Sequence, residues 1–169
     1  MMNIVLVGYR GTGKSVVARQ LAESVGQKVV SLDEEIERQE GCGIPEIVER
    51  RGWNGFRDVE EQVVRKYAAA DHQILDCGGG VIEREANMDV LRRAGTVVWL
   101  RASTATIVQR ISGNTQRPSL TGDKSFTQEV AEVLERRTPL YRRIAHIEVD
   151  TDDRAIEQVA AEILKQVQP

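Results

Sequence analysis

Cysteine, aromatic residues and long apolar runs are all scarce in this sequence. Its 169 residues include two cysteines, Cys42 and Cys77, which are too few for a disulfide framework and are not arranged as a metal-binding pair. Aromatic residues make up 4% of the chain, so we expect an aliphatic core. No apolar run approaches the roughly 20 residues that a membrane helix needs, and residues 4–7 form too short a run for a signal peptide. We therefore expect a cytoplasmic protein without a membrane partner.

An excess of positive charge is also missing. The chain has 23 Lys and Arg residues against 26 Asp and Glu residues, which gives a formal net charge of -3. Proteins that bind nucleic acids usually present a basic face, so we expect no nucleic-acid partner. The length suits one domain over residues 1–169, and no exposed apolar stripe argues against a monomer.

Short apolar runs rich in β-branched residues alternate with segments of helical periodicity. This alternation predicts an α/β fold with a parallel sheet, whose functional groups lie at the carboxyl ends of the strands. The loop near residues 112–124 contains Gly, Pro, Asn and Asp with little apolar periodicity, and its length predicts a mobile lid. We expect strands at residues 3–7, 28–32, 73–77, 96–100 and 146–149, and helices that include 14–25, 56–70, 126–141 and 152–168.

The segment Gly-Tyr-Arg-Gly-Thr-Gly-Lys-Ser at residues 8–15 matches the phosphate-loop pattern, between the first strand and the first helix. Glycines let consecutive backbone N–H groups and the positive end of the helix dipole face a polyphosphate. Lys14 is predicted to reach the β and γ phosphates, and the Ser15 hydroxyl to ligate Mg²⁺. The motif predicts nucleoside triphosphate binding but leaves the phosphate acceptor open, since GTPases and ATPases share it. The expected nucleotide contacts in the loop are Arg10, Gly11, Thr12, Gly13, Lys14 and Ser15.

Three further clusters follow later strands and are expected to converge on one crevice. Asp33 follows the second strand and could orient an attacking hydroxyl. Arg57 could grip a carboxylate, and the run Gly78 to Gly80 lets a ligand touch backbone N–H groups. Each cluster also has a plain structural explanation. Asp33 could cap a helix, Arg57 could form a surface ion pair with Glu60 or Glu61, and the glycines could form a bend.

Together these segments resemble the shikimate kinase family in order and spacing over nearly the whole chain. The resemblance implies a three-layer α/β phosphate-loop domain of the nucleoside-monophosphate-kinase type. Its five-stranded parallel sheet would have the strand order 2-3-1-4-5, with a lid near residues 112–124 and a substrate-binding region near residues 33–60. It also implies transfer of a phosphoryl group from ATP, with Mg²⁺, to the 3-hydroxyl of shikimate in aromatic amino acid biosynthesis. The matching segments are residues 8–15, 33–37, 55–57 with Glu60, 78–80, 113–118 and 137–141.

The resemblance also implies roles for residues on the acceptor side. Asp33 would hold the ring hydroxyls of shikimate and act as the base. Arg57 and Arg137 would bind the shikimate carboxylate, and the backbone of Gly79 would support the ring. Glu60 lies one helical turn beyond Arg57 and is expected to orient its guanidinium group.

On the nucleotide side, the resemblance implies roles for two arginines outside the glycine-rich loop. Arg117, in the lid, would close over the transferring phosphoryl group, where a cation stabilises the equatorial oxygens. Arg110 would lie along the adenine. A solvated helix face is the ordinary location for an arginine, and it remains the alternative for Arg110 and Arg137.

The sequence departs from the family at one position. Shikimate kinases usually have two aspartates, one residue apart, after the second strand, and the first of them serves the metal ion. Here Ser31 takes that first place and Asp33 keeps the second, so a metal-binding carboxylate is lost. Asp76, at the end of the neighbouring strand, is the candidate replacement. The alternative, in which Asp76 caps the next segment or pairs with an arginine, stays open.

Two other functions remain possible from the sequence. A related small-molecule kinase would be expected to lose at least one of Asp33, Arg57 and Arg137, and all three are present. A catalytically silent nucleotide-binding regulatory protein, descended from the kinase, is supported only by Ser31. Shikimate kinase is therefore the favoured interpretation.

Overall fold

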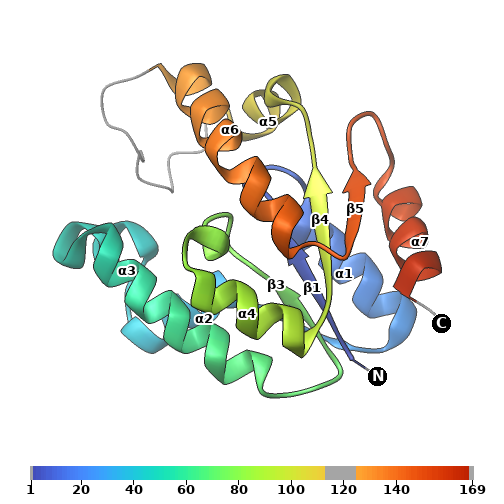
Figure 1. Cartoon of the computed structure of the whole chain (residues 1–169), viewed down its shortest axis with the longest axis horizontal. Coiled ribbons are helices and arrows are strands. Elements are labelled where there is room, and N and C mark those ends of the chain that lie inside the picture. The colour runs from blue at the N-terminus through green and yellow to red at the C-terminus, as the bar shows by residue number, and fades with distance from the viewer. Residues whose placement is uncertain (1, 113–124, 168–169) are drawn as a thin grey trace.

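The computed structural model describes residues 2–112 and 125–167 of the chain, and it contains a five-stranded sheet. All strand pairs are parallel, and the order β2-β3-β1-β4-β5 confirms the predicted order. Figure 1 shows β1 in the middle of the sheet, between β3 and β4. The strands are β1 (Asn3–Val7), β2 (Lys28–Ser31), β3 (Gln73–Asp76), β4 (Gly95–Arg101) and β5 (Ile147–Asp150).

Helices cover both faces of the sheet and complete three layers. Helices α1 and α7 pack on one face, and α3, α4 and α6 pack on the other (Figure 1). No helix in the described ranges is both long enough and apolar enough to cross a membrane. The helices are α1 (Lys14–Val25), α2 (Leu32–Glu40), α3 (Ile44–Ala68), the 3-10 turn η1 (Val81–Glu83), α4 (Glu85–Ala94), α5 (Thr104–Ile111), α6 (Phe126–Ile144) and α7 (Ile156–Val167).

The apolar run of β1 feeds two separate cores because successive side chains of a strand point to opposite faces. Ile4 and Leu6 pack with α1 and α7, whereas Val5 and Val7 pack with the helices on the other face. Both faces of the central strand are therefore buried. For this reason its sequence is a continuous apolar run and does not alternate between apolar and polar residues.

Helix α3 begins earlier than the sequence indicated. The predicted helix started at residue 56, whereas α3 begins at Ile44 and continues across a kink at Gly52. Gly52 has φ 69° and ψ 177°, a left-handed φ that favours glycine, and it interrupts the helical periodicity. The kink separates the short first part of α3 from the part that carries the predicted site residue Arg57.

The last helix was predicted to begin at residue 152, and this is wrong. Helix α7 begins at Ile156. The carboxylate of Asp152 accepts hydrogen bonds from the backbone N–H of Ser103 at 3.1 Å, and Asp153 has φ 51°. Residues 152–154 therefore form a turn, and Asp152 fastens it to the end of β4.

The lid predicted near residues 112–124 falls between α5 and α6 in the chain. Helix α5 ends at Ile111 and α6 begins at Phe126. Residues 113–124, with Arg117 among them, lie outside the described residues.

Replacing Leu75 with alanine is expected to lower the free energy of unfolding by about 3 kcal/mol. Leu75 is fully buried in β3, so the change removes apolar contacts and leaves a cavity. Chemical denaturation of both variants would measure the effect. Ile156→Ala, at a side chain that is 36% exposed, is the control and should change the value by no more than about 0.5 kcal/mol. Equal losses in the two variants would contradict this description of the core.

Candidate active site

The glycine-rich loop turns tightly between β1 and α1 and leaves no room for larger residues at two of its positions. Gly8 has φ 147°, and a Cβ atom there would lie 2.4 Å from the backbone oxygen of Leu100. Gly11 has φ 80°, and a Cβ atom there would lie 2.5 Å from the Cγ2 atom of Ile111. The backbone of the loop therefore packs closely against β4 and α5, and these contacts restrict its conformation.

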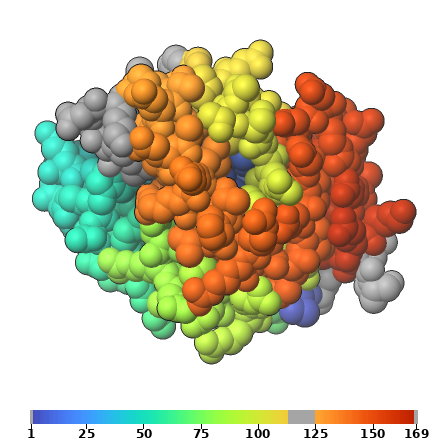
Figure 2. Space-filling view, turned by 45° about the horizontal axis from the view of Figure 1, so that its top comes forward, coloured from blue at the N-terminus to red at the C-terminus, as the bar shows by residue number. Residues whose placement is uncertain are grey.

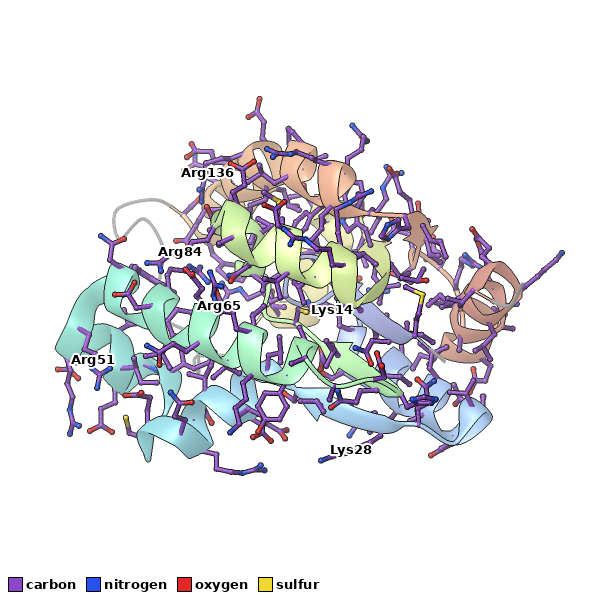
Figure 3. The ribbon with its side chains drawn as sticks, turned by 60° about the horizontal axis from the view of Figure 1, so that its bottom comes forward. Lys14, Lys28, Arg51, Arg65, Arg84 and Arg136 are labelled. Atoms are coloured by element: carbon purple, nitrogen blue, oxygen red, sulfur yellow. The ribbon has the colours of Figure 1, made fainter. Side chains whose placement is uncertain are left out.

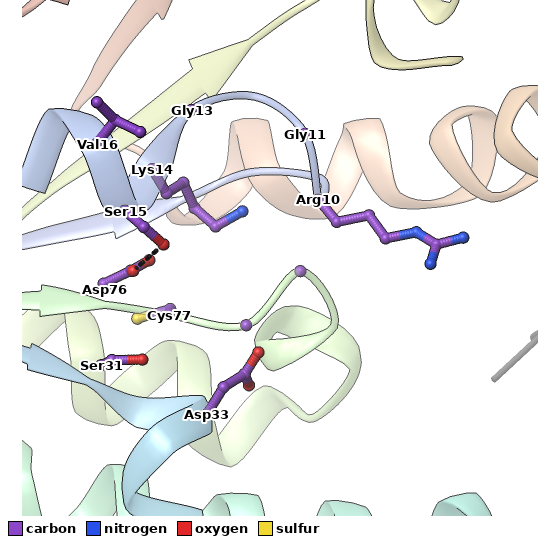
Figure 4. Close-up of a pocket in the computed structure, with 12 residues that line it drawn as sticks. Arg10, Gly11, Gly13, Lys14, Ser15, Val16, Ser31, Asp33, Asp76 and Cys77 are labelled. Atoms are coloured by element: carbon purple, nitrogen blue, oxygen red, sulfur yellow. Dashed lines mark hydrogen bonds between the residues drawn. The ribbon is translucent and has the colours of Figure 1, made fainter. Parts of the chain in front are cut away.

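Lys14 directs its ammonium group into the curve of this loop. Its Nζ atom donates hydrogen bonds to the backbone oxygens of Gly8 and Tyr9, at 2.8 and 3.0 Å. A cavity of about 240 Å³ opens beside it, lined by the loop, the start of α1 and the ends of β2 and β3. Figure 4 shows Lys14 on one side of this cavity and Asp33 on the other. A positive charge and a helix N-terminus thus face the same space, as an anionic polyphosphate requires.

Ser15 and Asp76 meet at the metal-binding position that the sequence predicted. The Ser15 hydroxyl donates a hydrogen bond of 2.6 Å to the Oδ2 atom of Asp76, drawn as a dashed line in Figure 4. Asp76 does not cap the following turn, whose N-cap is Gly80. Within the described ranges it also forms no ion pair with an arginine. A hydroxyl and a carboxylate oxygen are suitable Mg²⁺ ligands, and this pair fits the ion that the phosphate loop implies.

Within residues 2–112 and 125–167, no group of three or more His, Cys, Asp or Glu side chains could hold a metal ion, so no larger acidic cluster surrounds this pair there. A Mg²⁺ ion at Ser15 and Asp76 would therefore depend on nucleotide phosphates and water for its other ligands, which is how this ion is usually held in phosphate-transferring enzymes.

The three glycines after β3 are the point where the acceptor-side residues converge. A Cβ atom on Gly78 would lie 2.6 Å from Oδ1 of Asp33, and one on Gly80 would lie 2.1 Å from Nη2 of Arg57. A Cβ atom on Gly79 would lie 3.5 Å from Nη1 of Arg137. Because Gly78 and Gly80 lack side chains, the Asp33 carboxylate and the Arg57 guanidinium group can approach this short stretch of backbone, and the Arg137 guanidinium group lies at ordinary contact distance from Gly79. Asp33 and Gly78 line the cavity beside Lys14, whereas Arg57 and Arg137 line a separate cavity, so the single crevice expected from the sequence stays a prediction.

The plain explanation of Asp33 as a helix cap is wrong. Ser31 is the N-cap of α2, and its hydroxyl oxygen accepts a hydrogen bond from the backbone N–H of Glu34 at 3.4 Å. Asp33 lies within the first turn of α2, and its carboxylate faces the glycines and the cavity (Figure 4).

Arg57 is held by Glu60, as the spacing of the two residues predicted. Its Nη1 atom lies 2.7 Å from Oε1 of Glu60, and the two side chains are 11% and 2% exposed. Burial raises the pKa of Glu60 above its usual value, although the positive charge of Arg57 opposes the shift. The guanidinium group also lies 5.5 Å and 5.1 Å from the ring centroids of Trp53 and Phe56. Arg57 is thus an oriented arginine whose side chain is largely shielded from solvent, rather than one in a surface ion pair.

Arg137 is buried, so the alternative of a solvated helix face is wrong for this residue. Its side chain is 5% exposed, and its Nε atom donates a hydrogen bond of 2.7 Å to Oε1 of Glu83. The other carboxylate oxygen of Glu83 accepts a hydrogen bond of 2.7 Å from Arg136. Burial pushes the pKa of Glu83 upward, but the hydrogen bonds and charges of Arg137 and Arg136 bring it below its usual value. Glu83 therefore holds Arg137 by one edge of the guanidinium group.

Sequence reasoning did not identify Glu83 as part of the site. Glu83 and Arg137 are separated by 54 positions, so no local spacing could have paired them. A cavity of about 360 Å³ lies beside them, and its lining includes four arginines. Figure 3 labels two of the four, Arg84 and Arg136. The lining of this cavity is predominantly positive and suits a ligand with a negative charge.

Arg110 connects the glycine-rich loop to the segment after β5 through hydrogen bonds. Its Nη1 atom donates to the backbone oxygen of Gly11 at 3.1 Å, and its Nη2 atom donates to the backbone oxygen of Thr151 at 3.1 Å. Across the loop, the guanidinium group of Arg10 lies 5.8 Å from the ring centroid of Phe126, at the start of α6. The adenine contact expected of Arg110 stays a prediction.

A further cavity of about 350 Å³ lies on the other side of the loop. It is bounded by the end of β4, α5 and α6, with Tyr9 and Thr12 among its lining residues. Figure 2 shows this hollow between α5 and α6, with N-terminal residues visible at its base. The loop thus has space on both sides.

The fold and these residues define a phosphate-loop kinase domain. A family model described as shikimate kinase matches residues 10–168. The chain is 40% identical to the shikimate kinase of Symbiobacterium thermophilum over 169 residues, covering 99% of this chain and 97% of that one. It is 41% identical to the shikimate kinase of Marinomonas sp. over 165 residues, covering 96% and 90%. The chain belongs to the shikimate kinase family.

Two solved structures of shikimate kinases are also similar to this chain. Shikimate kinase from Acinetobacter baumannii, in complex with shikimate, matches with a TM-score of 0.95 at 36% identity and covers 99% of this chain and 93% of its own. Shikimate kinase from Aquifex aeolicus matches with a TM-score of 0.84 at 29% identity, covering 97% and 95%. The similarity therefore extends over the substrate-side and nucleotide-side elements alike.

Replacing Glu60 with glutamine is expected to lower the free energy of unfolding by about 1–3 kcal/mol. The change removes the charged partner of a largely shielded guanidinium group, and leaving such a polar group without its partner is costly. Glu46→Gln on the same helix is the matched control, because Glu46 pairs with Arg50 while both side chains are largely exposed. It should cost no more than about 0.5 kcal/mol. Denaturation curves that shift equally for both variants would contradict the structural role of Glu60.

Proposed function

We propose that this protein is an ATP-dependent shikimate kinase, which transfers the γ-phosphoryl group of ATP to the 3-hydroxyl of shikimate. The observation that carries the proposal is the approach of Asp33, Arg57 and Arg137 to the three glycines after β3, two of which line the cavity of Lys14 together with Asp33. An anionic substrate with several hydroxyl groups suits a site with two arginines and one carboxylate. The complex of the Acinetobacter baumannii relative with shikimate supports the same substrate.

The acceptor is held by its carboxylate and its ring hydroxyls. Arg57 and Arg137 bind the carboxylate through the guanidinium nitrogens that Glu60 and Glu83 leave available. Asp33 orients the attacking hydroxyl and accepts its proton, and the backbone of Gly78, Gly79 and Gly80 supports the ring. Positioning is the main contribution here, since phosphoryl transfer leaves little covalent chemistry to the protein.

On the donor side, Lys14 exchanges the carbonyl oxygens of Gly8 and Tyr9 for the β and γ phosphates of ATP. The backbone N–H groups of the glycine-rich loop bind the other phosphate oxygens, while Arg110 borders the adenine. Arg117 closes over the transferring group as part of a lid near residues 112–124. Ser15 and Asp76 would hold Mg²⁺, which would supply positive charge to offset that of the phosphates.

The proposal extends to the organisation of the whole chain. We propose one domain over residues 1–169, with a substrate-binding region near residues 33–60, that works as a monomer in the cytoplasm. Its partner is a small molecule rather than a membrane or a nucleic acid. The alternative of a catalytically silent regulatory protein rests on Ser31 alone, whereas Lys14, Asp33 and Arg137 all line the described cavities.

ADP release from MgATP, with and without shikimate, tests the proposed function. Shikimate is expected to stimulate release strongly, because an acceptor hydroxyl is then in line with the γ phosphate. Quinate is the control, since it also has a carboxylate and ring hydroxyls on a differently shaped ring. ATP binding without any stimulation by shikimate would overturn the proposal. Omission of Mg²⁺ should abolish the stimulated rate.

Replacing Arg137 with lysine is expected to raise the KM for shikimate by about 10- to 100-fold with a smaller effect on kcat. Lysine keeps the charge but cannot form two parallel hydrogen bonds with a carboxylate. Arg136→Lys is the matched control, because Arg136 also contacts Glu83 but its side chain is 57% exposed. Steady-state kinetics would measure both. The same rise in KM in the control would mean that the Glu83 contact, and not a contact with the acceptor, is responsible.

A further inference from the structure

The ends of β2 and β3 present two equivalent positions to the metal-binding edge of the sheet. Ser31 and Asp76 are register partners in the parallel pairing of these strands. Neighbouring strands lie about 4.8 Å apart, and register partners in a parallel pair direct their side chains to the same face. A carboxylate on either strand can therefore serve the same space beside Ser15.

Only one of these two positions has a carboxylate in this chain. Ser31 is neutral, and its hydroxyl oxygen accepts the hydrogen bond that caps α2. Asp76 is 6% exposed, and its carboxylate accepts the hydrogen bond from Ser15. The family pattern has the carboxylate at the position of Ser31. This chain therefore has one carboxylate at these two positions, and it is on β3 rather than on β2.

The surroundings of Asp76 leave room for a hydrated ion. The cavity beside the glycine-rich loop and a second cavity of about 240 Å³ both include Ser15, Ser31 and Asp76 in their linings. Ser15 is exposed, and Arg19 and Glu34 also line the second cavity. Mg²⁺ keeps several water ligands, so a pair of protein oxygens that opens into a wet space is a suitable site.

We infer that the carboxylate serving Mg²⁺ has moved across one strand pair, from the position of Ser31 on β2 to Asp76 on β3. The inference rests on the proposed function in that the nucleotide is bound with Mg²⁺. Asp76 and Ser15 hold the ion together, and Ser31 contributes to the start of α2 instead. The site keeps one negative charge opposite the ion, which a serine alone could not supply.

A reciprocal exchange of residues tests this inference without measuring catalysis. Mn²⁺ binding to the complex with ADP is followed by the electron paramagnetic resonance signal of free Mn²⁺. Asp76→Asn keeps the shape of the side chain and is expected to weaken Mn²⁺ binding by at least about tenfold. The double variant Ser31→Asp/Asp76→Asn is expected to recover most of that loss. Aspartate is also a good N-cap residue, so Ser31→Asp should leave α2 intact.

Two controls isolate the metal site. ADP affinity in EDTA should not weaken in Asp76→Asn, because the lost carboxylate repels phosphates when no metal is present. Asp89→Asn, at an exposed position on α4, removes the same charge far from the loop and should leave Mn²⁺ binding unchanged. Circular dichroism confirms that each variant is folded.

Unchanged Mn²⁺ binding in folded Asp76→Asn would overturn the inference, and so would a double variant that binds no better than Asp76→Asn. The proposed function is assessed separately on the wild-type protein by shikimate-stimulated ADP release. Stimulated release together with unchanged Mn²⁺ binding in Asp76→Asn would leave the function standing and remove the inference. Weakened Mn²⁺ binding in Asp76→Asn that is recovered in the double variant, without stimulation of ADP release by shikimate, would support the inference and refute shikimate as the substrate.

Discussion

Asp33 and Arg57 can approach the turn after β3 only because Gly78 and Gly80 have no side chain, and Arg137 lies beside Gly79 between them. The three charged groups come from α2, α3 and α6, and any Cβ atom on Gly78 or Gly80 would occupy the place of an oxygen or nitrogen atom of Asp33 or Arg57. The parallel sheet brings the same glycines next to the loop that contains Lys14, because the ends of β1 and β3 are adjacent. The distance between the acceptor groups and the phosphate site is therefore a consequence of strand pairing.

The buried Arg137 and the largely shielded Arg57 have individual carboxylate partners. A buried guanidinium group needs a counterion, yet a buried ion pair contributes little net stability because both charges must be removed from water. Glu60 and Glu83 are thus better understood as groups that fix the orientation of Arg57 and Arg137. The pKa shifts of these carboxyl groups differ in sign for a physical reason. Glu60 has the more buried environment and its pKa is raised, whereas Glu83 receives hydrogen bonds from two arginines and its pKa is lowered.

The edge of the sheet beside Ser15 illustrates how strand pairing makes positions on different strands equivalent in space. The backbone of a parallel sheet offers several strand ends at the same level, and a metal ion responds to the position and charge of oxygen atoms, not to the strand that carries them. Ser15 at the start of α1 is adjacent to β3 in space, as its hydrogen bond with Asp76 demonstrates. Register between strands, rather than proximity in sequence, decides which substitutions can compensate one another.

The sequence by itself determined the elements whose signals are local. β1 and α1 were predicted to the residue, because an apolar run, a glycine-rich loop and a regular apolar period follow one another directly. The spacing of Arg57 and Glu60 on one helix also predicted their contact. The order of the sheet came from the resemblance to a family, since five short strands are compatible with several orders.

Only the tertiary structure decided which distant groups act together. Asp152 looks like the start of a helix, but it bonds to Ser103, 49 positions away, and α7 begins later. Glu83 has no local signal for its contact with Arg137, and the burial of Arg137 depends on elements that lie far apart in the chain. Helical and strand periods report on neighbours within a few residues, whereas burial and ion pairing depend on packing across the whole fold.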